Sequence, residues 1–273
     1  MIEKSKTPGE YLEFERDGWG AFISGYNDTF GAVTRQTVQA TLDAAKVGSG
    51  TRLLDICCGP GMLSDAAAER GAHAVGLDFP GVVELARRLV PTAEFMSGDA
   101  LDLPFADGSF DAVVCGYGVM HVPDPEKAMQ EMLRVLRPGG HAALSVWDND
   151  PRSGLGLVYR AVQALANLDV PMPHGPGIFQ FSSLDKMRDA LSDIGFADTD
   201  AALFPQYWRL RSARQLLDAV HEGTVRTRAV LAAQTPDVMA KIAASIEAGF
   251  DDLQPDGSYK VPMPAIIGSG RKP

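Results

Sequence analysis

The sequence predicts an α/β protein: a doubly wound, mostly parallel β-sheet with helical lid and cap insertions. Two observations carry this prediction. Between residues 51 and 147, short apolar runs alternate with amphipathic helical patterns, an order typical of right-handed βαβ units. One of these runs, FDAVVC at 110–115, is apolar at every position except Asp111, which is typical of a strand buried on both faces of a sheet.

The first two strands are expected at 51–56 and 73–77. Between them, helical signals run over 62–70, and Gly71 is suited to cap the helix end in a left-handed conformation. After the second strand, Pro80 suits the first turn of a helix whose apolar face ends before Pro91.

Three further strands are expected at 93–96, 110–115 and 141–147. Between the last two, Asp124 is a predicted N-cap with Pro125 at the first helical position. The apolar residues that follow recur at helical spacing, and Pro138-Gly139-Gly140 is expected to end this helix before the fifth strand.

Three segments organise the chain around this alternation. Residues 1–46 are expected to form an N-terminal helical lid, and residues 47–147 form the core. Residues 148–273 complete the sheet, with strands near 198–209 and 258–268, and carry a helical cap over about 148–180 and 212–253. Ligands of open α/β sheets bind at the carboxyl edge of the strands, so we expect the lid and cap there.

Composition narrows the class of function. Hydrophobic residues make up 45% of the 273 positions and charged residues 22%, the balance of a globular protein. The net charge of −10 disfavours nucleic acid as a partner. The three cysteines form no zinc-type pair, so no metal is expected. No signal peptide and no apolar run near ~18 residues is visible, which predicts a cytoplasmic protein without membrane association.

A glycine-containing turn follows the first strand. Asp55 ends that strand, and Gly59 and Gly61 let the backbone approach a ligand closely. The spacing does not match the dinucleotide fingerprint, because Cys57 and Ser64 stand where glycine is required. An NAD-dependent oxidoreductase is therefore a disfavoured alternative.

Four segments in order then resemble class I S-adenosylmethionine (SAM)-dependent methyltransferases. They are the first strand with its turn (LLDICCGPG, 53–61), Asp78 after the second strand, the stretch from Gly98-Asp99-Ala100 to Asp111, and RVLRPGG at 134–140. In appearance they are most similar to small-molecule methyltransferases of ubiquinone and menaquinone biosynthesis. The resemblance covers residues 50–147 and implies a Rossmann-like fold, SAM as the cofactor and methyl transfer to a small molecule.

The resemblance also implies a set of cofactor-binding residues. A carboxylate at Asp78 suits a ribose diol, Phe79 an adenine face, and Asp99 with the Ala100 amide the adenine edge. The alternatives are that Asp78 caps a helix and that Asp99 is an ordinary turn residue. Cys57 stands where the family usually has glycine. The full expected set is Asp55, Cys57, Gly59, Gly61, Asp78, Phe79, Asp99, Ala100 and Gly116.

His121 is the candidate general base. It follows the end of the fourth strand, where a neutral imidazole suits removal of a proton from a hydroxyl nucleophile. The alternative is a histidine that only holds its loop. Four further residues are candidates for substrate binding, with core packing as the alternative for the N-terminal aromatic residues: Trp19, Tyr26, Tyr117 and His174.

The sequence leaves the acceptor open. Oxygen is the preferred methyl acceptor, ring carbon the second choice, and nitrogen is not distinguished from them. Arg226 and Arg228 are either ligands for an acidic substrate group or solvated surface residues. A protein with this fold that binds a small molecule or catalyses a rearrangement without methyl transfer remains the other alternative. A homodimer is compatible with the sequence.

Overall fold

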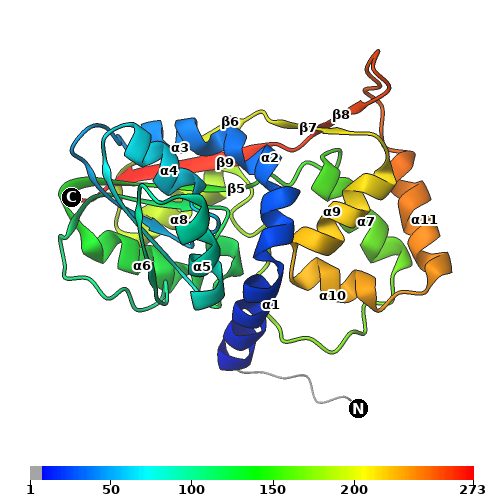
Figure 1. Cartoon of the computed structure of the whole chain (residues 1–273), viewed down its shortest axis with the longest axis horizontal. Coiled ribbons are helices and arrows are strands. Elements are labelled where there is room, and N and C mark those ends of the chain that lie inside the picture. The colour runs from blue at the N-terminus through cyan, green and yellow to red at the C-terminus, as the bar shows by residue number, and fades with distance from the viewer. Residues whose placement is uncertain (1–7) are drawn as a thin grey trace.

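The computed structural model describes residues 8–273, which form a seven-stranded sheet in the order β3-β2-β1-β4-β5-β9-β6 (Figure 1). The strands are β1 (Arg52–Ile56), β2 (His73–Asp78), β3 (Glu94–Ser97), β4 (Phe110–Gly116), β5 (Leu136–Trp147), β6 (Ala197–Phe204) and β9 (Ala265–Arg271). Neighbours among β1 to β5 pair in parallel, and β9 is antiparallel to both β5 and β6. The predicted mostly parallel, doubly wound sheet is confirmed.

Helices cover both faces of this sheet. Alternate residues of the strands separate the two faces: Leu53 and Ala112 pack with α3 and α4, and Leu54 and Val113 belong to the core on the side of α6. The helices are α1 (Pro8–Asp28), α2 (Gly31–Thr34), α3 (Val38–Ala44), α4 (Met62–Glu69), α5 (Pro80–Leu89), α6 (Pro125–Val135), α7 (Gly154–Leu165), α8 (Leu184–Ile194), α9 (Ala213–Gly223), α10 (Arg226–Ala232) and α11 (Pro236–Glu247).

The local start signals work as the sequence predicts. The side chain of Asp124 accepts a hydrogen bond from the Lys127 backbone N–H at 2.9 Å, and Pro125 occupies the first turn of α6. This arrangement satisfies one of the free N–H groups at the helix start. The predicted N-cap is confirmed.

The fifth strand begins earlier than predicted. β5 starts at Leu136, opposite Phe110, and the pairing then resumes with His141 opposite Ala112. The register shift between these pairs absorbs the Pro-Gly-Gly turn, in which Gly139 adopts a φ of 79°. A bulge therefore lets the chain pass directly from α6 into the sheet, where a separate loop was expected.

The two late strands also differ from the expectation, because each is divided in two. The segment near 198–209 forms β6 in the main sheet and then β7 (Tyr207–Leu210). The segment near 258–268 forms β8 (Tyr259–Pro262) and then β9, and β7 pairs with β8 in a separate antiparallel ribbon. The chain changes sheets at Pro205-Gln206 and at Met263-Pro264.

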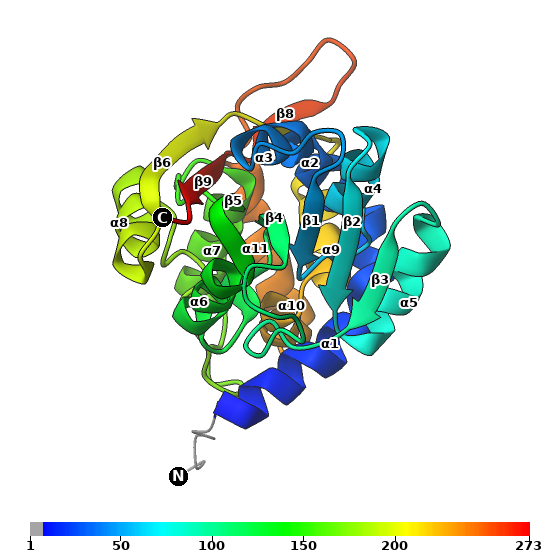
Figure 2. The same cartoon turned by 90° about the vertical axis from the view of Figure 1, so that its left-hand side faces the viewer.

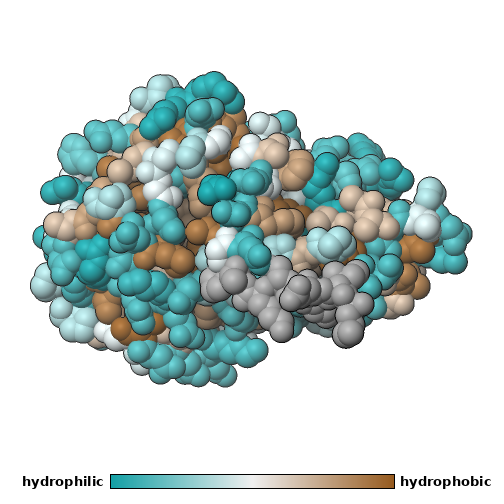
Figure 3. All heavy atoms as spheres, turned by 90° about the horizontal axis from the view of Figure 1, so that it is seen from below, coloured by the Kyte–Doolittle hydropathy of each residue, from teal (hydrophilic) through white to brown (hydrophobic). Residues whose placement is uncertain are grey.

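Helix α1 crosses the molecule below the carboxyl ends of β1 and β2 (Figure 2). It contacts α5 on the core side and α9 in the cap, which α7, α9, α10 and α11 form on the right-hand side of Figure 1. Polar and charged side chains cover most of the face seen from below, with smaller apolar patches between them (Figure 3). The fold thus places the N-terminal helix and the cap around one edge of the sheet.

Candidate active site

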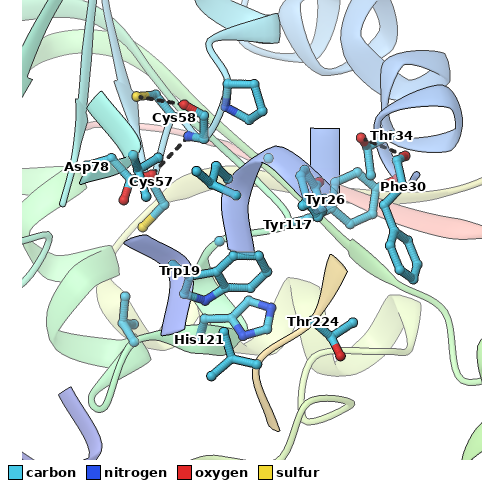
Figure 4. A pocket seen from close by; sticks show the side chains of 18 of the residues that line it. Trp19, Tyr26, Phe30, Thr34, Cys57, Cys58, Asp78, Tyr117, His121 and Thr224 are labelled. Atoms are coloured by element: carbon cyan, nitrogen blue, oxygen red, sulfur yellow. Dashed lines mark hydrogen bonds between the residues drawn. The ribbon is translucent and has the colours of Figure 1, made fainter. Parts of the chain in front are cut away.

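A pocket lies at the carboxyl edge of the sheet, between the strand ends, α1 and the cap. Its lining combines the ends of β1, β2, β4 and β5 with side chains of α1 and with the segment 223–227. In Figure 4, Asp78 and the two neighbouring cysteines lie at one side, Tyr26, Tyr117 and Phe30 at the other, and Trp19 and His121 between them. The structure therefore assembles one site from segments distant in the chain.

The turn after β1 opens onto the pocket at Gly59. This glycine has a φ of 55°, and a Cβ added to it would meet no atom within 4 Å. Gly61 differs: its φ is 89°, a Cβ there would come within 2.8 Å of the Phe95 ring, and it lies outside the pocket lining. Gly59 leaves room for a ligand, whereas Gly61 permits close packing at the start of α4.

Cys57 also adopts a left-handed conformation, with a φ of 52°. This explains why glycine is the usual residue of the family at this position, since glycine adopts such angles without steric cost. Across from it, a Cβ on Gly118 would lie 2.3 Å from the Cys57 Cβ and 2.9 Å from the Cys115 sulfur. The side chain of Cys57 thus occupies space that Gly118 leaves free.

Asp55 is fully buried at the base of the turn. One of its carboxylate oxygens accepts hydrogen bonds from the Ser64 backbone N–H at 3.1 Å and from the Ser64 hydroxyl at 2.7 Å. The other oxygen, Oδ1, has no hydrogen-bond partner among the described residues. Burial raises the pKa of Asp55 to about 7, although the bonds from Ser64 favour its ionised form.

Asp78, at the end of β2, is joined to the glycine turn. Its two oxygens accept hydrogen bonds from the backbone N–H of Gly59 at 2.9 Å and of Phe79 at 2.7 Å. Burial raises the pKa of Asp78 to about 6 against the opposing effect of these bonds. Both Asp78 and Phe79 line the pocket.

The remaining expected cofactor residues lie along the same wall. Asp99 accepts a hydrogen bond from the Leu101 backbone N–H at 2.9 Å through one oxygen, which shapes its loop. Asp99, Ala100 and Gly116 all line the pocket. The structure therefore brings together the whole expected cofactor set with the exception of Gly61.

Aromatic rings form the opposite wall. Trp19 meets Tyr26 edge-on at 5.7 Å between ring centroids, and Tyr26 stacks on Phe30 at 6.0 Å. Tyr117 packs at 4.3 Å against Trp147, which ends β5 and which the sequence did not single out as a pocket residue. The Tyr117 hydroxyl is used internally, because it accepts a hydrogen bond from Gln206 at 2.8 Å.

His121 lies between these two walls and contacts a buried carboxylate. Its Nδ1 is 3.4 Å from an oxygen of Glu15, whose side chain is only 1% exposed. The indole of Trp19 donates to the same oxygen at 2.8 Å and packs edge-on against the imidazole. Glu15 was missed by the sequence reasoning, because two of its partners, His121 and Arg226, come from segments distant in the sequence.

The two candidate arginines are half-buried, and each has partners within the protein. Arg226 is 3.3 Å from Glu15 and donates to the carbonyl oxygens of Pro176 and Met120. Arg228 lies 4.0 Å from the centroid of the Phe22 ring and donates to the His221 carbonyl. Both guanidinium groups thus have partners within the protein, and because Arg226 also lines the pocket, a role toward an acidic substrate group stays a prediction.

His174 does not reach the pocket. It is exposed in the loop that follows α7, and it is absent from the pocket lining. The neighbouring Gly175 sits directly on the Tyr11 ring, where a Cβ would lie within 2.0 Å of it. The backbone of this loop, and not its histidine, faces α1.

Neither a metal centre nor a membrane-spanning helix is found in the part of the chain that the structure describes. Within residues 8–273, no group of three or more His, Cys, Asp or Glu side chains is arranged to hold a metal ion. Over the same range, no helix has the length and apolarity needed to span a membrane.

Comparison with known proteins identifies the family to which the chain belongs. The model of a methyltransferase domain family matches residues 54–144. A demethylmenaquinone methyltransferase of Renibacterium salmoninarum is 34% identical over 176 residues, which cover 60% of this chain and 74% of that protein. The chain belongs to the class I SAM-dependent methyltransferase family.

Solved structures share the fold of this methyltransferase at low sequence identity. A SAM-dependent methyltransferase of Thermotoga maritima superposes with a TM-score of 0.56 at 18% identity, covering 95% of this chain and 100% of that chain. A phosphoethanolamine N-methyltransferase of Haemonchus contortus, solved with S-adenosylhomocysteine, gives a TM-score of 0.52 at 18% identity, covering 87% and 52%. The predicted Rossmann-like methyltransferase fold is confirmed.

Proposed function

We propose that this methyltransferase transfers the methyl group of SAM to a ring carbon of a hydroxylated aromatic small molecule of the hydroquinone class. The observation that carries the proposal is the division of the pocket. One half has the acids and open glycine turn expected for SAM, and the other half is walled by aromatic rings with His121 at the boundary.

The residues of the first half fit SAM. The buried Oδ1 of Asp55 has no partner, and the position of a Gly59 Cβ is open space, so an amino-acid tail finds both an acceptor and room. Asp78 would hold the ribose diol, and Asp99 with Ala100 would bind the adenine edge. When bound, SAM supplies an electrophilic methyl group and leaves as a neutral thioether.

The residues of the second half would bind and activate the acceptor. Trp19, Tyr26 and Tyr117 offer flat apolar surfaces for a planar ring, which also exclude water. His121 would take the proton of a ring hydroxyl, and the resulting electron density reaches the adjacent ring carbon that attacks the methyl group. Transfer of that carbon's own proton to the ring oxygen would then restore the aromatic hydroxyl, and the proton held by His121 would pass to solvent. Holding both reactants in line contributes roughly 7–11 kcal/mol to such a reaction, and the base contributes about 10²- to 10⁴-fold in rate.

Carbon is proposed here in place of oxygen, which the sequence alone favoured. The support comes from the demethylmenaquinone methyltransferase that shares 34% identity with this chain, because its name describes a quinone-type acceptor. An aromatic pocket suits such a ring. A hydroxyl acceptor remains an outcome that the experiment distinguishes.

We further propose that α1 acts as the lid. It contributes Trp19, Ile23 and Tyr26 to the pocket and lies across the carboxyl edge that a ligand must enter. A methyl donor has to be shielded from water while an acceptor enters and leaves, which is a common task of such segments.

A panel of acceptors tests the proposal. The protein would be incubated with methyl-labelled SAM and, separately, with naphthohydroquinones unsubstituted next to a hydroxyl and with matched phenols blocked at the neighbouring carbons. We expect carbon-bound label in the first group and no turnover in the second, as read by ¹³C NMR of the products. Oxygen-bound label would overturn the carbon assignment, and an absence of label in every acceptor class would count against methyl transfer to aromatic rings.

A further inference from the structure

A carboxylate without direct access to solvent lies behind the pocket. The side chain of Glu15 is 1% exposed and faces donors from three different elements. The Trp19 indole donates to Oε2 at 2.8 Å, Nδ1 of His121 lies 3.4 Å from the same oxygen, and Nε of Arg226 lies 3.3 Å from Oε1. Burying a charge in this way is costly unless it is paired, so the cluster requires an explanation.

The cluster keeps Glu15 ionised. Burial opposes ionisation, but the contacts with His121 and Arg226 hold the pKa of Glu15 below its ordinary value. The other ionisable side chains that face this group are the phenols of Tyr11 on α1 and Tyr159 on α7. Burial raises the pKa of both, so they stay neutral. The group therefore contains a carboxylate at Glu15 and a guanidinium at Arg226, beside the ring of His121.

An ionised carboxylate determines which imidazole nitrogen carries the proton. Glu15 offers only acceptors, so Nδ1 of His121 must donate to it, and a neutral ring then has its lone pair on Nε2. Among the described residues, no group makes a hydrogen bond of regular geometry with Nδ1, and the carboxylate of Glu15, 3.4 Å away, is the acceptor that it faces. Because His121 lines the pocket, Nε2 is the nitrogen left for the acceptor.

We propose that Glu15 is a positioning residue for the methyl-transfer reaction: it holds His121 in the tautomer and orientation of a general base. The inference rests on the proposed role of His121. A separation of 3.4 Å is long for a hydrogen bond, but catalytic hydrogen bonds commonly tighten only when the substrate complex forms.

The position of Glu15 on α1 links the base to the lid. The same helix carries Trp19 and Tyr26 into the pocket, so the carboxylate reaches His121 only when α1 is seated. Arg226 of α10 connects Glu15 to two further segments of the chain. It donates to the Pro176 carbonyl at 2.6 Å and to the Met120 carbonyl, beside His121, at 3.0 Å. His121 would therefore be held ready to remove a proton only while α1 covers the pocket.

The test is Glu15→Gln, which keeps the size of the side chain. The neutral amide removes the negative charge that holds the ring proton on Nδ1, and an amide NH₂ turned toward His121 would itself donate to Nδ1 at the cost of the bond from the Trp19 indole. The ring proton then moves to Nε2, which removes the lone pair from the pocket. We expect ¹⁵N NMR at pH 8 to show the Nδ1–H tautomer in the wild type and the Nε2–H tautomer in the variant, with kcat lowered about tenfold or more. KM and the SAM dissociation constant should change by less than about twofold, since positioning acts on the chemical step.

The matched control is Glu13→Gln, which removes the same charge from an exposed position on the same helix. It should leave the tautomer and kcat unchanged. Glu15→Asp is the second variant, because it retains a carboxylate on a shorter stem and should keep the Nδ1–H tautomer even where packing suffers.

The outcomes separate this inference from the proposed function. Full activity of His121→Ala would show that His121 is not the general base, which would refute the proposed role of His121. An inactive His121→Ala together with a fully active Glu15→Gln would refute only the role of Glu15. An Nε2–H tautomer in the wild-type protein would refute it without any variant, so a poorly folded Glu15→Gln leaves the test intact.

Discussion

SAM binding should weaken on acidification, because the carboxyl groups that face the pocket ionise at a higher pH than ordinary Asp side chains. Burial raises the pKa of Asp78 to about 6 and that of Asp55 to about 7. A carboxyl with a raised pKa is neutral below that value. The ionised form, which attracts the sulfonium and accepts from the ribose, is therefore lost as the pH falls through 7 and 6.

The magnitude follows from these two values. At pH 5 about one in ten Asp78 side chains is ionised, so the requirement for that carboxylate alone weakens SAM binding about tenfold relative to pH 8. If Asp55 must also be ionised for binding, its pKa of about 7 weakens SAM binding at pH 5 by a further factor of about a hundred. Binding should release protons throughout this range, since the bound cation favours the ionised acids.

Calorimetry from pH 8 to pH 5, in buffers of different ionisation enthalpy, measures both the affinity and the protons released. Asp78→Asn should weaken binding at pH 8 by about 1–3 kcal/mol. The new amide has a single acceptor oxygen for the Gly59 and Phe79 N–H groups and the ribose. The variant should also lose the Asp78 part of the pH dependence. Asp102→Asn, an exposed acid of the neighbouring loop, is the control. A SAM affinity that stays constant from pH 8 to pH 5 would refute the reasoning.

Three further predictions concern the base, the lid and the turn. His121→Ala should lower kcat by about 10²-fold with SAM affinity nearly intact, measured by initial rates and calorimetry, and unchanged rates at every pH would contradict a base. Hydrogen exchange over 11–30 and 171–177 should slow when SAM and acceptor bind, and protection indifferent to ligand would make these segments ordinary core. Gly118→Ala should destabilise the protein by about 1–3 kcal/mol in urea unfolding, because its Cβ would lie 2.3 Å from that of Cys57; an unchanged midpoint would show that the turn relaxes.

The parts of the fold that short-range chemistry determines were predictable. Asp124 followed by Pro125 marks the start of α6, and the apolar run at 110–115 marks a buried strand, because each signal lies within a few residues of the element it specifies. The divided strands were not predictable in this way. Whether the chain leaves the main sheet at Pro205-Gln206 depends on β8, which is distant in the sequence and pairs with β7.

The cofactor half of the site follows the same rule. Asp55, Gly59 and Asp78 each lie at or just after a strand end, so strand order alone brings them to one edge. The acceptor half of the pocket could not be predicted from strand order, because its residues come together from α1, β5 and the cap. Nothing beside Glu15 in the sequence indicates that Arg226 will reach it, and the burial of this pair is decided only when the tertiary structure forms.

The position of β9 in the sheet has a consequence for how the chain is made. Among residues 8–273, strand β6 has β9 as its only neighbour in the main sheet, and β9 also covers the edge of β5. On a ribosome, β6 and α8 emerge long before β9, and three of the four cap helices, α9, α10 and α11, are synthesised in between. Until β9 arrives, β5 presents an open edge, the kind of surface on which nascent chains aggregate. We expect the sheet to close late, with β9 as the final strand, so that chaperone dependence and sensitivity to translation speed should concentrate in the synthesis of residues 148–271.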